Sequence, residues 1–83
     1  MKLNLGCYDR KINGFVNVDI REDVKPDVTD NVFELNKFEK NSADLIYACH
    51  VLEHADYKES EIAMKRWCDV LKKGGTLRLA VPD

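Results

Sequence analysis

Two short segments of this chain end in residues with complementary chemical abilities. Residues 3–5 are mainly apolar and lead into Gly6, and residues 16–18 lead in the same way into Asp19. Glycine has no Cβ, so the backbone N–H groups around it can approach a ligand closely. An ionised carboxylate only accepts hydrogen bonds and can take both hydroxyl groups of a ribose. Each residue also has a simpler interpretation, in which Gly6 allows a turn and Asp19 ends a strand. If both segments are parallel strands whose ends meet, they predict a crevice for a nucleoside.

The pattern of apolar residues predicts a sheet that positions these two residues. Only residues 6–14 separate the first two strands, which is short for a parallel crossover and predicts a loop or a single turn there. Pro26 removes a ladder donor and places the third strand on an edge, whereas the apolar run of the fourth suits a central position. Strands are expected at residues 2–5, 15–20, 27–29, 43–49 and 76–81.

A helix is expected at residues 58–71, because apolar residues recur there at intervals of three and four. Lys72 and Lys73 would complement the carboxyl end of the helix dipole, and Gly74-Gly75 would end the helix in a left-handed conformation. Residues 31–42 are irregular, and their apolar side chains are expected to pack a loop against the sheet. The predicted helix face is Ile62, Ala63, Trp67, Val70 and Leu71, and the loop side chains are Val32, Phe33, Leu35 and Phe38.

Composition narrows the class of protein. The chain has 83 residues, 45% of them hydrophobic and 34% charged, which is typical of one small globular domain rather than a disordered or membrane-spanning chain. The net charge of −2 and the scattered basic pairs do not favour nucleic acid as a partner. Three cysteines without C-x-x-C spacing, and no apolar run of signal-peptide or membrane-spanning length, predict a reduced, cytoplasmic protein without a membrane anchor.

Four motifs in order resemble a known family. They are L-N-L-G-C at residues 3–7, V-D-I at 18–20, N-S-A-D-L-I-Y-A-C-H-V-L-E-H at 41–54 and V-L-K-K-G-G-T-L-R-L-A-V-P-D at 70–83. Together they resemble class I S-adenosylmethionine-dependent methyltransferases, in particular the small-molecule methyltransferase domain group. The resemblance implies a Rossmann-like, three-layer α/β sandwich with a mainly parallel sheet in the order 3-2-1-4-5. It also implies S-adenosylmethionine as the cofactor and methyl transfer to an unidentified acceptor.

The resemblance also assigns roles by position. His50 is a candidate general base for an acceptor that must lose a proton, because the ordinary pKa of histidine is near neutral; its simpler interpretation is a polar residue that closes a loop. Tyr8 stands where the family usually has a second glycine, and its side chain must point away from the cofactor or narrow the pocket. The implied contacts are Gly6 and Cys7 under the methionine portion, Asp19 at the ribose hydroxyls, Asp30 near the adenine amino group, and Cys49 with His50 beside the sulfonium. Ile20 is a further expected cofactor-binding residue.

The resemblance covers the cofactor-binding part of the family fold. The sequence stops after the strand expected at residues 76–81, whereas the family fold continues through further strands that complete the sheet. Residues 1–83 are therefore interpreted as a single truncated domain. Its last strand would be an apolar edge, so either this is a fragment or a second chain or copy pairs with that edge.

Three other interpretations remain open. The string His50-Val-Leu-Glu53-His54 matches H-x-x-E-H, a zinc-hydrolase signature that requires a helix and a third ligand. A nicotinamide-binding unit also has a glycine and an acid at these strand ends, but this chain lacks G-x-G-x-x-G. The third is a non-catalytic remnant or nucleotide-binding interaction module, since fold and activity are separate questions. The candidate third zinc ligands are Glu59, Glu61 and Asp69.

Overall fold

A computed structural model describes residues 1–49, 51 and 55–80. Its five strands form one sheet in the order β3-β2-β1-β4-β5, and every neighbouring pair is parallel. This confirms the predicted Rossmann-like α/β fold and its strand order. The elements in chain order are β1 (Lys2–Leu5), β2 (Val16–Asp19), the 3-10 turn η1 (Glu22–Val24), β3 (Val28–Thr29), β4 (Ala43–Cys49), α1 (Tyr57–Val70) and β5 (Leu71–Ala80).

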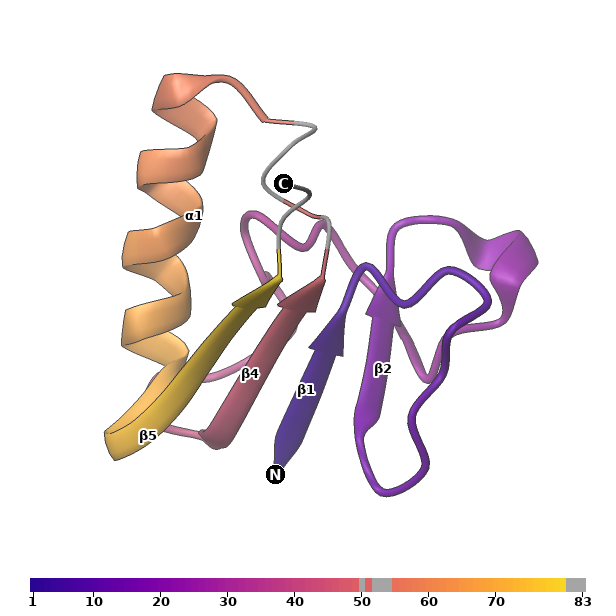
Figure 1. The fold of residues 1–83 in the computed structure, drawn as a ribbon, viewed down its shortest axis with the longest axis horizontal. Helices are drawn as coiled ribbons and strands as arrows, with labels where there is room; N and C mark the ends of the chain where they lie inside the picture. The colour runs from indigo at the N-terminus through magenta and orange to yellow at the C-terminus, as the bar shows by residue number, and fades with distance from the viewer. Residues whose placement is uncertain (50, 52–54, 81–83) are drawn as a thin grey trace.

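The strand order reverses beside β1, which lies between β2 and β4. Leu5, the last residue of β1, is in register with Val18 of β2 and with Ala48 of β4. The carboxyl ends of the strands therefore lie along one edge of the sheet, and the arrowheads in Figure 1 point to it. In open parallel sheets a ligand crevice forms at this edge, where the order reverses.

One face of the sheet packs against α1, and this packing forms the core. Leu3, Leu5 and Ile46 are fully buried against Trp67 of the helix. The buried helix positions are Ala63, Trp67 and Val70, which lie on one side of a helix because they are four and three residues apart. Ile62, predicted to share this face, is instead 61% exposed. It precedes Ala63 by one position and is therefore rotated by about 100° from it.

The chain between β3 and β4 also covers this face, as predicted from its apolar side chains. Leu35 is fully buried, while Val32, Phe33 and Phe38 pack against the core. Trp67 donates its indole N–H to the carbonyl of Val32 at 2.7 Å. The neighbouring Arg66 donates to three more carbonyls of the segment, those of Glu34, Leu35 and Phe38. The irregular segment is thus fixed mainly by side chains of the helix.

On the opposite face, residues 6–15 join β1 to β2 without a helix, as the short connection predicted, and they are held over these two strands. Two buried amides hold this loop. Asn4 donates to the carbonyl of Arg10 and to the side chain of Asn17, both at 2.9 Å. Asn17 accepts from the backbone N–H of Ile12 and donates to the carboxylate of Asp27. In the described part of the chain, the outer layer on this face is therefore a loop rather than a helix.

The ends of α1 differ from the prediction. The helix begins after Asp56, whose carboxylate accepts the Glu59 N–H in a capping box. It ends at Val70, and Leu71 is already extended, so the last turn contains no basic residue. Gly74, at φ +83°, and Gly75 lie within β5 rather than ending the helix. The register passes from Ala43–Leu71 to Leu45–Thr76, so residues 72–75 bulge out of the pairing.

β5 begins five residues earlier than predicted and is an edge strand of the described sheet. Pairing of a second chain or copy with β5 stays a prediction, which sedimentation tests: a strictly monomeric protein would contradict it. No described helix is both long and apolar enough to cross a bilayer. Cys7, Cys49 and Cys68 are free thiols, and the cytoplasmic location stays a prediction.

Candidate functional site

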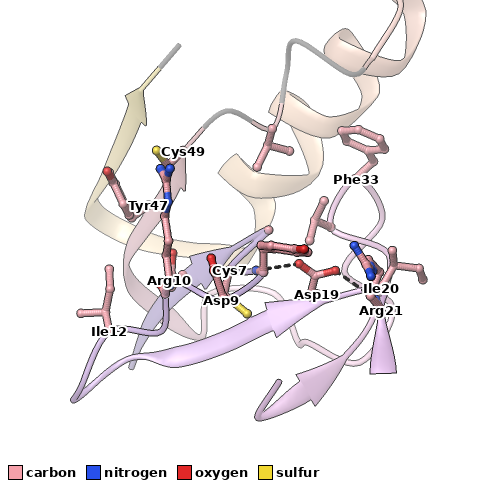
Figure 2. A pocket seen from close by; sticks show the side chains of 15 residues that line it. Cys7, Asp9, Arg10, Ile12, Asp19, Ile20, Arg21, Phe33, Tyr47 and Cys49 are labelled. Atoms are coloured by element: carbon pink, nitrogen blue, oxygen red, sulfur yellow. Dashed lines mark hydrogen bonds between the residues drawn. The ribbon is translucent and has the colours of Figure 1, made fainter. Parts of the chain in front are cut away.

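A cavity of about 1000 Å³ lies at the carboxyl edge of the sheet, where β1, β2 and β4 end. Figure 2 shows its side chains in two groups, one around Asp19 and Phe33 and one around Arg10 and Tyr47. Between them lies the backbone of the loop that follows β1. The lining residues are Asn4, Gly6, Cys7, Tyr8, Asp9, Arg10, Ile12, Asp19, Ile20, Arg21, Val32, Phe33, Tyr47, Cys49 and Val51.

Two backbone N–H groups hold the Asp19 carboxylate at the end of β2, one from the loop after β1 and one from the residues that follow β2. Its Oδ2 accepts the N–H of Tyr8 and its Oδ1 accepts the N–H of Arg21, each at 2.9 Å. The residue is only 7% exposed. Each carboxylate oxygen has about two acceptor positions, so each keeps one after these bonds are made. The carboxylate is thus preorganised and can still accept two hydroxyl donors.

Gly6 is required at its position for two physical reasons. Its φ is +65°, a conformation that side chains disfavour. A Cβ placed there would also lie 2.9 Å from Cγ2 of Val51, closer than carbon atoms pack. The N–H groups of Gly6 and Cys7 both donate to the carbonyl of Val18, at 2.8 and 3.1 Å. The loop therefore starts close to β2, and the role of Gly6 as a site of close approach to a ligand stays a prediction.

Cys7 lies beside Asp19 and is 2% exposed. Burial raises the pKa of its thiol above the ordinary value, and the negative charge of Asp19 raises it further. A neutral, buried thiol is a poor nucleophile. Cys7 therefore contributes a wall to the cavity rather than a reactive group.

Tyr8, the departure from the family pattern, lies at the rim of the cavity. Its φ is +45° and the residue is 49% exposed. The guanidinium of Arg21 lies 4.9 Å from the centre of its ring, a cation–π contact, and pairs with Asp23 at 2.7 Å. The Arg21 side chain holds the pKa of Asp23 below its usual value. Tyr8 and Arg21 thus form a stacked pair in the cavity lining next to Asp19.

The second group of side chains comes from β4 and from the loop after β1. Tyr47 and Cys49 alternate with the core residues of β4 and face the cavity, with Arg10 beside them (Figure 2). The neighbouring Cys49 side chain raises the pKa of the Tyr47 phenol, while the charges of Arg10 and Arg78 oppose that shift. This end of the cavity combines an aromatic ring, a thiol and a guanidinium.

Asp30 does not line the cavity. It is 5% exposed, and its Oδ1 accepts the N–H groups of Asn31 and Asn36 at 2.8 and 3.2 Å. Its Oδ2 accepts the N–H of Lys37 at 2.8 Å. These contacts order the loop after β3, a structural role that the sequence did not indicate. The adenine contact implied for Asp30 stays a prediction, and the position of its carboxylate does not favour it.

The cavity brings together most of the residues that the sequence singled out, which are Gly6, Cys7, Asp19, Ile20 and Cys49. His50 lies outside the described residues. Sequence reasoning missed Arg10, Arg21 and Tyr47 as lining residues. Tyr47 could have been found, because it is two residues before Cys49 and therefore on the same face of the strand. Arg10 and Arg21 lie on irregular segments, where no periodicity marks the direction of a side chain.

The zinc interpretation gains no support from the part of the chain that the structure describes. Its key residues His50, Glu53 and His54 fall outside that part. Within residues 1–49, 51 and 55–80, no three histidine, cysteine, aspartate or glutamate side chains are grouped as metal ligands. The candidate third ligands Glu59, Glu61 and Asp69 belong to α1 and do not line the cavity.

Comparison with known proteins gives one match. A family model described as a methyltransferase domain matches residues 11–79, well over half of the chain. Neither a search of curated proteins nor a search of solved structures gave a match. The matched stretch includes Asp19 and all of β4 and α1, which build much of the cavity and its support. This confirms the resemblance: the chain belongs to the family of class I S-adenosylmethionine-dependent methyltransferase domains.

Proposed function

We propose that the cavity binds S-adenosylmethionine and that the protein presents its methyl group to an acceptor. The observation that carries this proposal is the geometry of Asp19. The carboxylate is buried at the end of β2, is fixed by one backbone N–H at each oxygen, and keeps acceptor capacity toward the cavity. The 2′- and 3′-hydroxyl groups of a ribose supply two donors that such a carboxylate can accept.

The remaining lining fits the other parts of the cofactor. Val32 and Phe33 supply apolar contacts near Asp19, and Ile20 exposes 61% of its surface there. A planar base covering these side chains would remove apolar surface from water. Gly6 keeps the start of the loop after β1 close to β2, where a larger residue would meet Val51. These features support a nucleoside near Asp19, with the rest of the cofactor running over Gly6 toward Cys49.

Methyl transfer from the cofactor requires little of the protein beyond positioning the two reactants. When bound, the cofactor supplies a methyl group on a sulfonium, and as the acceptor's lone pair bonds to the methyl carbon, the C–S pair stays on sulfur. The cavity lining orients the two reactants and excludes water, which are the main contributions available. Cys7 is held neutral and does not compete as a nucleophile. No catalytic residue is assigned; His50 stays a candidate base for acceptors that must lose a proton, because the ordinary pKa of histidine is near neutral.

Titration calorimetry with S-adenosylmethionine and S-adenosylhomocysteine tests the proposal. We expect both to bind the wild-type protein, and Asp19→Asn to weaken binding about 100-fold, because two hydrogen bonds to a charged acceptor are disturbed. The matched control is Asp44→Asn. It changes the charge equally, but Asp44 is paired with the N-terminus and Lys72 and does not line the cavity.

The control should bind as wild type does. Far-ultraviolet circular dichroism of each variant separates lost binding from lost fold. Absence of binding to either ligand at millimolar concentration would contradict the proposal and favour a non-catalytic module. Unchanged affinity in Asp19→Asn would show that the ligand binds elsewhere.

A further inference from the structure

The cavity is longer than the nucleoside end requires, and its far end has a different character. Figure 2 shows Arg10, Ile12, Tyr47 and Cys49 gathered away from Asp19 and Phe33. Both groups line the same cavity. If the cofactor occupies the Asp19 end and extends to Cys49, the side chains beyond Cys49 are free to contact a second molecule. That molecule would lie next to the transferred methyl group.

A second cavity, of about 310 Å³, continues from this end across the sheet. Ile12 and Tyr47 line both cavities, so the two are adjacent. The second is also lined by Phe15, Leu45 and Arg78. Leu45 and Tyr47 are two residues apart on β4 and therefore share a sheet face, and Arg78 of β5 is in register with Tyr47. We call the surface formed by Arg10, Ile12, Phe15, Leu45, Tyr47 and Arg78 the acceptor groove.

The acceptor groove combines flat apolar walls with two guanidinium groups. Phe15, Tyr47 and the two aliphatic side chains suit a planar ring. Arg10 lies beside Tyr47 in the lining of the main cavity (Figure 2), and Arg78 is in register with Tyr47 on β5. Among the described residues, no carboxylate lies within 4 Å of either guanidinium, although Asp9 lines the main cavity next to Arg10 in the chain. The groove is thus locally cationic on a chain with a net charge of −2.

The backbone around Arg10 is also fixed, although its side chain is exposed. Its N–H donates to the carbonyl of Cys7 at 2.6 Å, and its own carbonyl accepts from the buried Asn4 amide at 2.9 Å. Arg78 is fixed differently, by the pairing of β5 with β4. Two arginines on rigid backbone, on either side of an aromatic ring, are suited to an anionic group on a flat molecule, because a guanidinium pairs with carboxylate or phosphate in a fork geometry.

We propose that the acceptor groove binds a small aromatic acid, a ring that carries a carboxylate or phosphate, as the methyl acceptor. This rests on the proposed function, because it requires the cofactor at the other end of the cavity. The ring lies against Tyr47 and Phe15, and the anion lies between Arg10 and Arg78. Binding in this orientation holds the ring's nucleophilic substituent near Cys49, where the resemblance places the sulfonium.

The first test uses benzoate, phenyl phosphate and neutral benzamide as probes. Each is titrated into the full chain and followed by amide chemical shifts in a nitrogen–proton NMR spectrum. We expect benzoate or phenyl phosphate to shift the resonances of Tyr47 and its neighbours, and benzamide to bind at least about tenfold more weakly, since it lacks the charge. The better of the two anions identifies the acidic group. Equal binding of benzamide, or no shift near Tyr47 with either anion, would overturn the proposal.

Variants of the two arginines give the second test. Arg78→Gln and Arg10→Gln should each weaken binding of the preferred anion about tenfold. Lys73→Gln is the matched control, because it removes one exposed positive charge from β5 outside the groove. If Lys73→Gln weakens binding as much as Arg78→Gln, the effect is general electrostatics and the groove is not a specific site.

The third test separates this proposal from the proposed function. The preferred anion is titrated with and without saturating S-adenosylhomocysteine. Simultaneous binding supports neighbouring sites, whereas mutual displacement would show that the anion occupies the cofactor site and would overturn the acceptor assignment. If the anion binds but the cofactor does not, the proposed function fails while the groove's ligand class stands. If the cofactor binds but the anion does not, the proposed function stands and the ligand class proposed for the groove fails.

Discussion

Asp19 and Asp30 follow or end neighbouring strands of the sheet, and they are similarly buried, at 7% and 5% exposure. Asp19 accepts one N–H at each oxygen and lines the cavity. Asp30 accepts three N–H groups from its own loop and lies outside the cavity lining. An acid at a strand end therefore does not by itself indicate a ligand. What distinguishes the two is the acceptor capacity that remains after the backbone is satisfied, and the direction in which it faces.

The largest expected effect is the loss of stability when the Asp30 carboxylate is removed. Asp30→Ala leaves three loop N–H groups without their acceptor and should lower the free energy of unfolding by about 3 kcal/mol. Asp19→Ala removes two such bonds and should cost less, about 2 kcal/mol, at a site open to water. Urea denaturation followed by tryptophan fluorescence measures both, because Trp67 packs in the core. Equal losses, or a larger loss for Asp19→Ala, would show that the two carboxylates do not differ in structural role.

A smaller loss of stability is expected at Gly6, in the loop whose backbone contacts Asp19. Gly6→Ala places a Cβ 2.9 Å from Val51 at φ +65° and should lower the free energy of unfolding by about 2 kcal/mol. Gly14→Ala is the matched control. Gly14 has φ +86° but nothing within 4 Å of the added Cβ, so only the backbone strain of about 1 kcal/mol applies.

The same denaturation experiment compares the two glycine variants. The double variant Gly6→Ala/Val51→Ala should recover part of the steric component, after allowance for Val51→Ala alone. Equal stability of Gly6→Ala and Gly14→Ala would contradict close packing of the loop against Val51.

The smallest effect concerns the influence of the Asp19 charge on the pKa of the Cys7 thiol. Burial and then Asp19 raise the pKa of the Cys7 thiol, so the folded state holds its proton more tightly than the unfolded state does. The resulting stabilisation is complete below the ordinary thiol pKa of 9.0 and is lost as the pH rises through the folded pKa. Asp19→Asn should therefore increase the alkylation rate of Cys7 by iodoacetamide at pH 9, measured by peptide mass spectrometry.

Asp30 is the comparison for this measurement too, because its charge does not contribute to the raised pKa of the Cys7 thiol. Exposed Cys68 is the internal standard for reagent activity. A Cys7 rate that is the same in Asp19→Asn and wild type, after correction by Cys68, would show that the Asp19 charge does not reach the thiol.

The elements of the fold were largely predictable because their signals are local. Alternation and apolar runs located β1 and β4 at their observed bounds, and helical spacing located α1 within one residue at each end. The glycine pair Gly74-Gly75 is predicted as the left-handed stop after the helix, but the chain becomes extended at Leu71. The register with β4 decides this boundary, since Leu71 already pairs with Ala43. A glycine pair is equally compatible with a helix stop and with a bulge.

The sequence by itself determined where most strands and the helix lie and the chemical types at the strand ends, because hydrophobic period and residue type can be read along the chain. The strand order was implied by the family resemblance. Only the tertiary structure decided which carboxylate lines the cavity, because that depends on how the segments around each strand end are arranged. It also decided that Arg10, Tyr47 and Arg78 meet on one sheet face. Parallel strand pairing and the fixed loop after β1 bring these three residues together from segments far apart in the chain. No local sequence pattern predicts that they are neighbours.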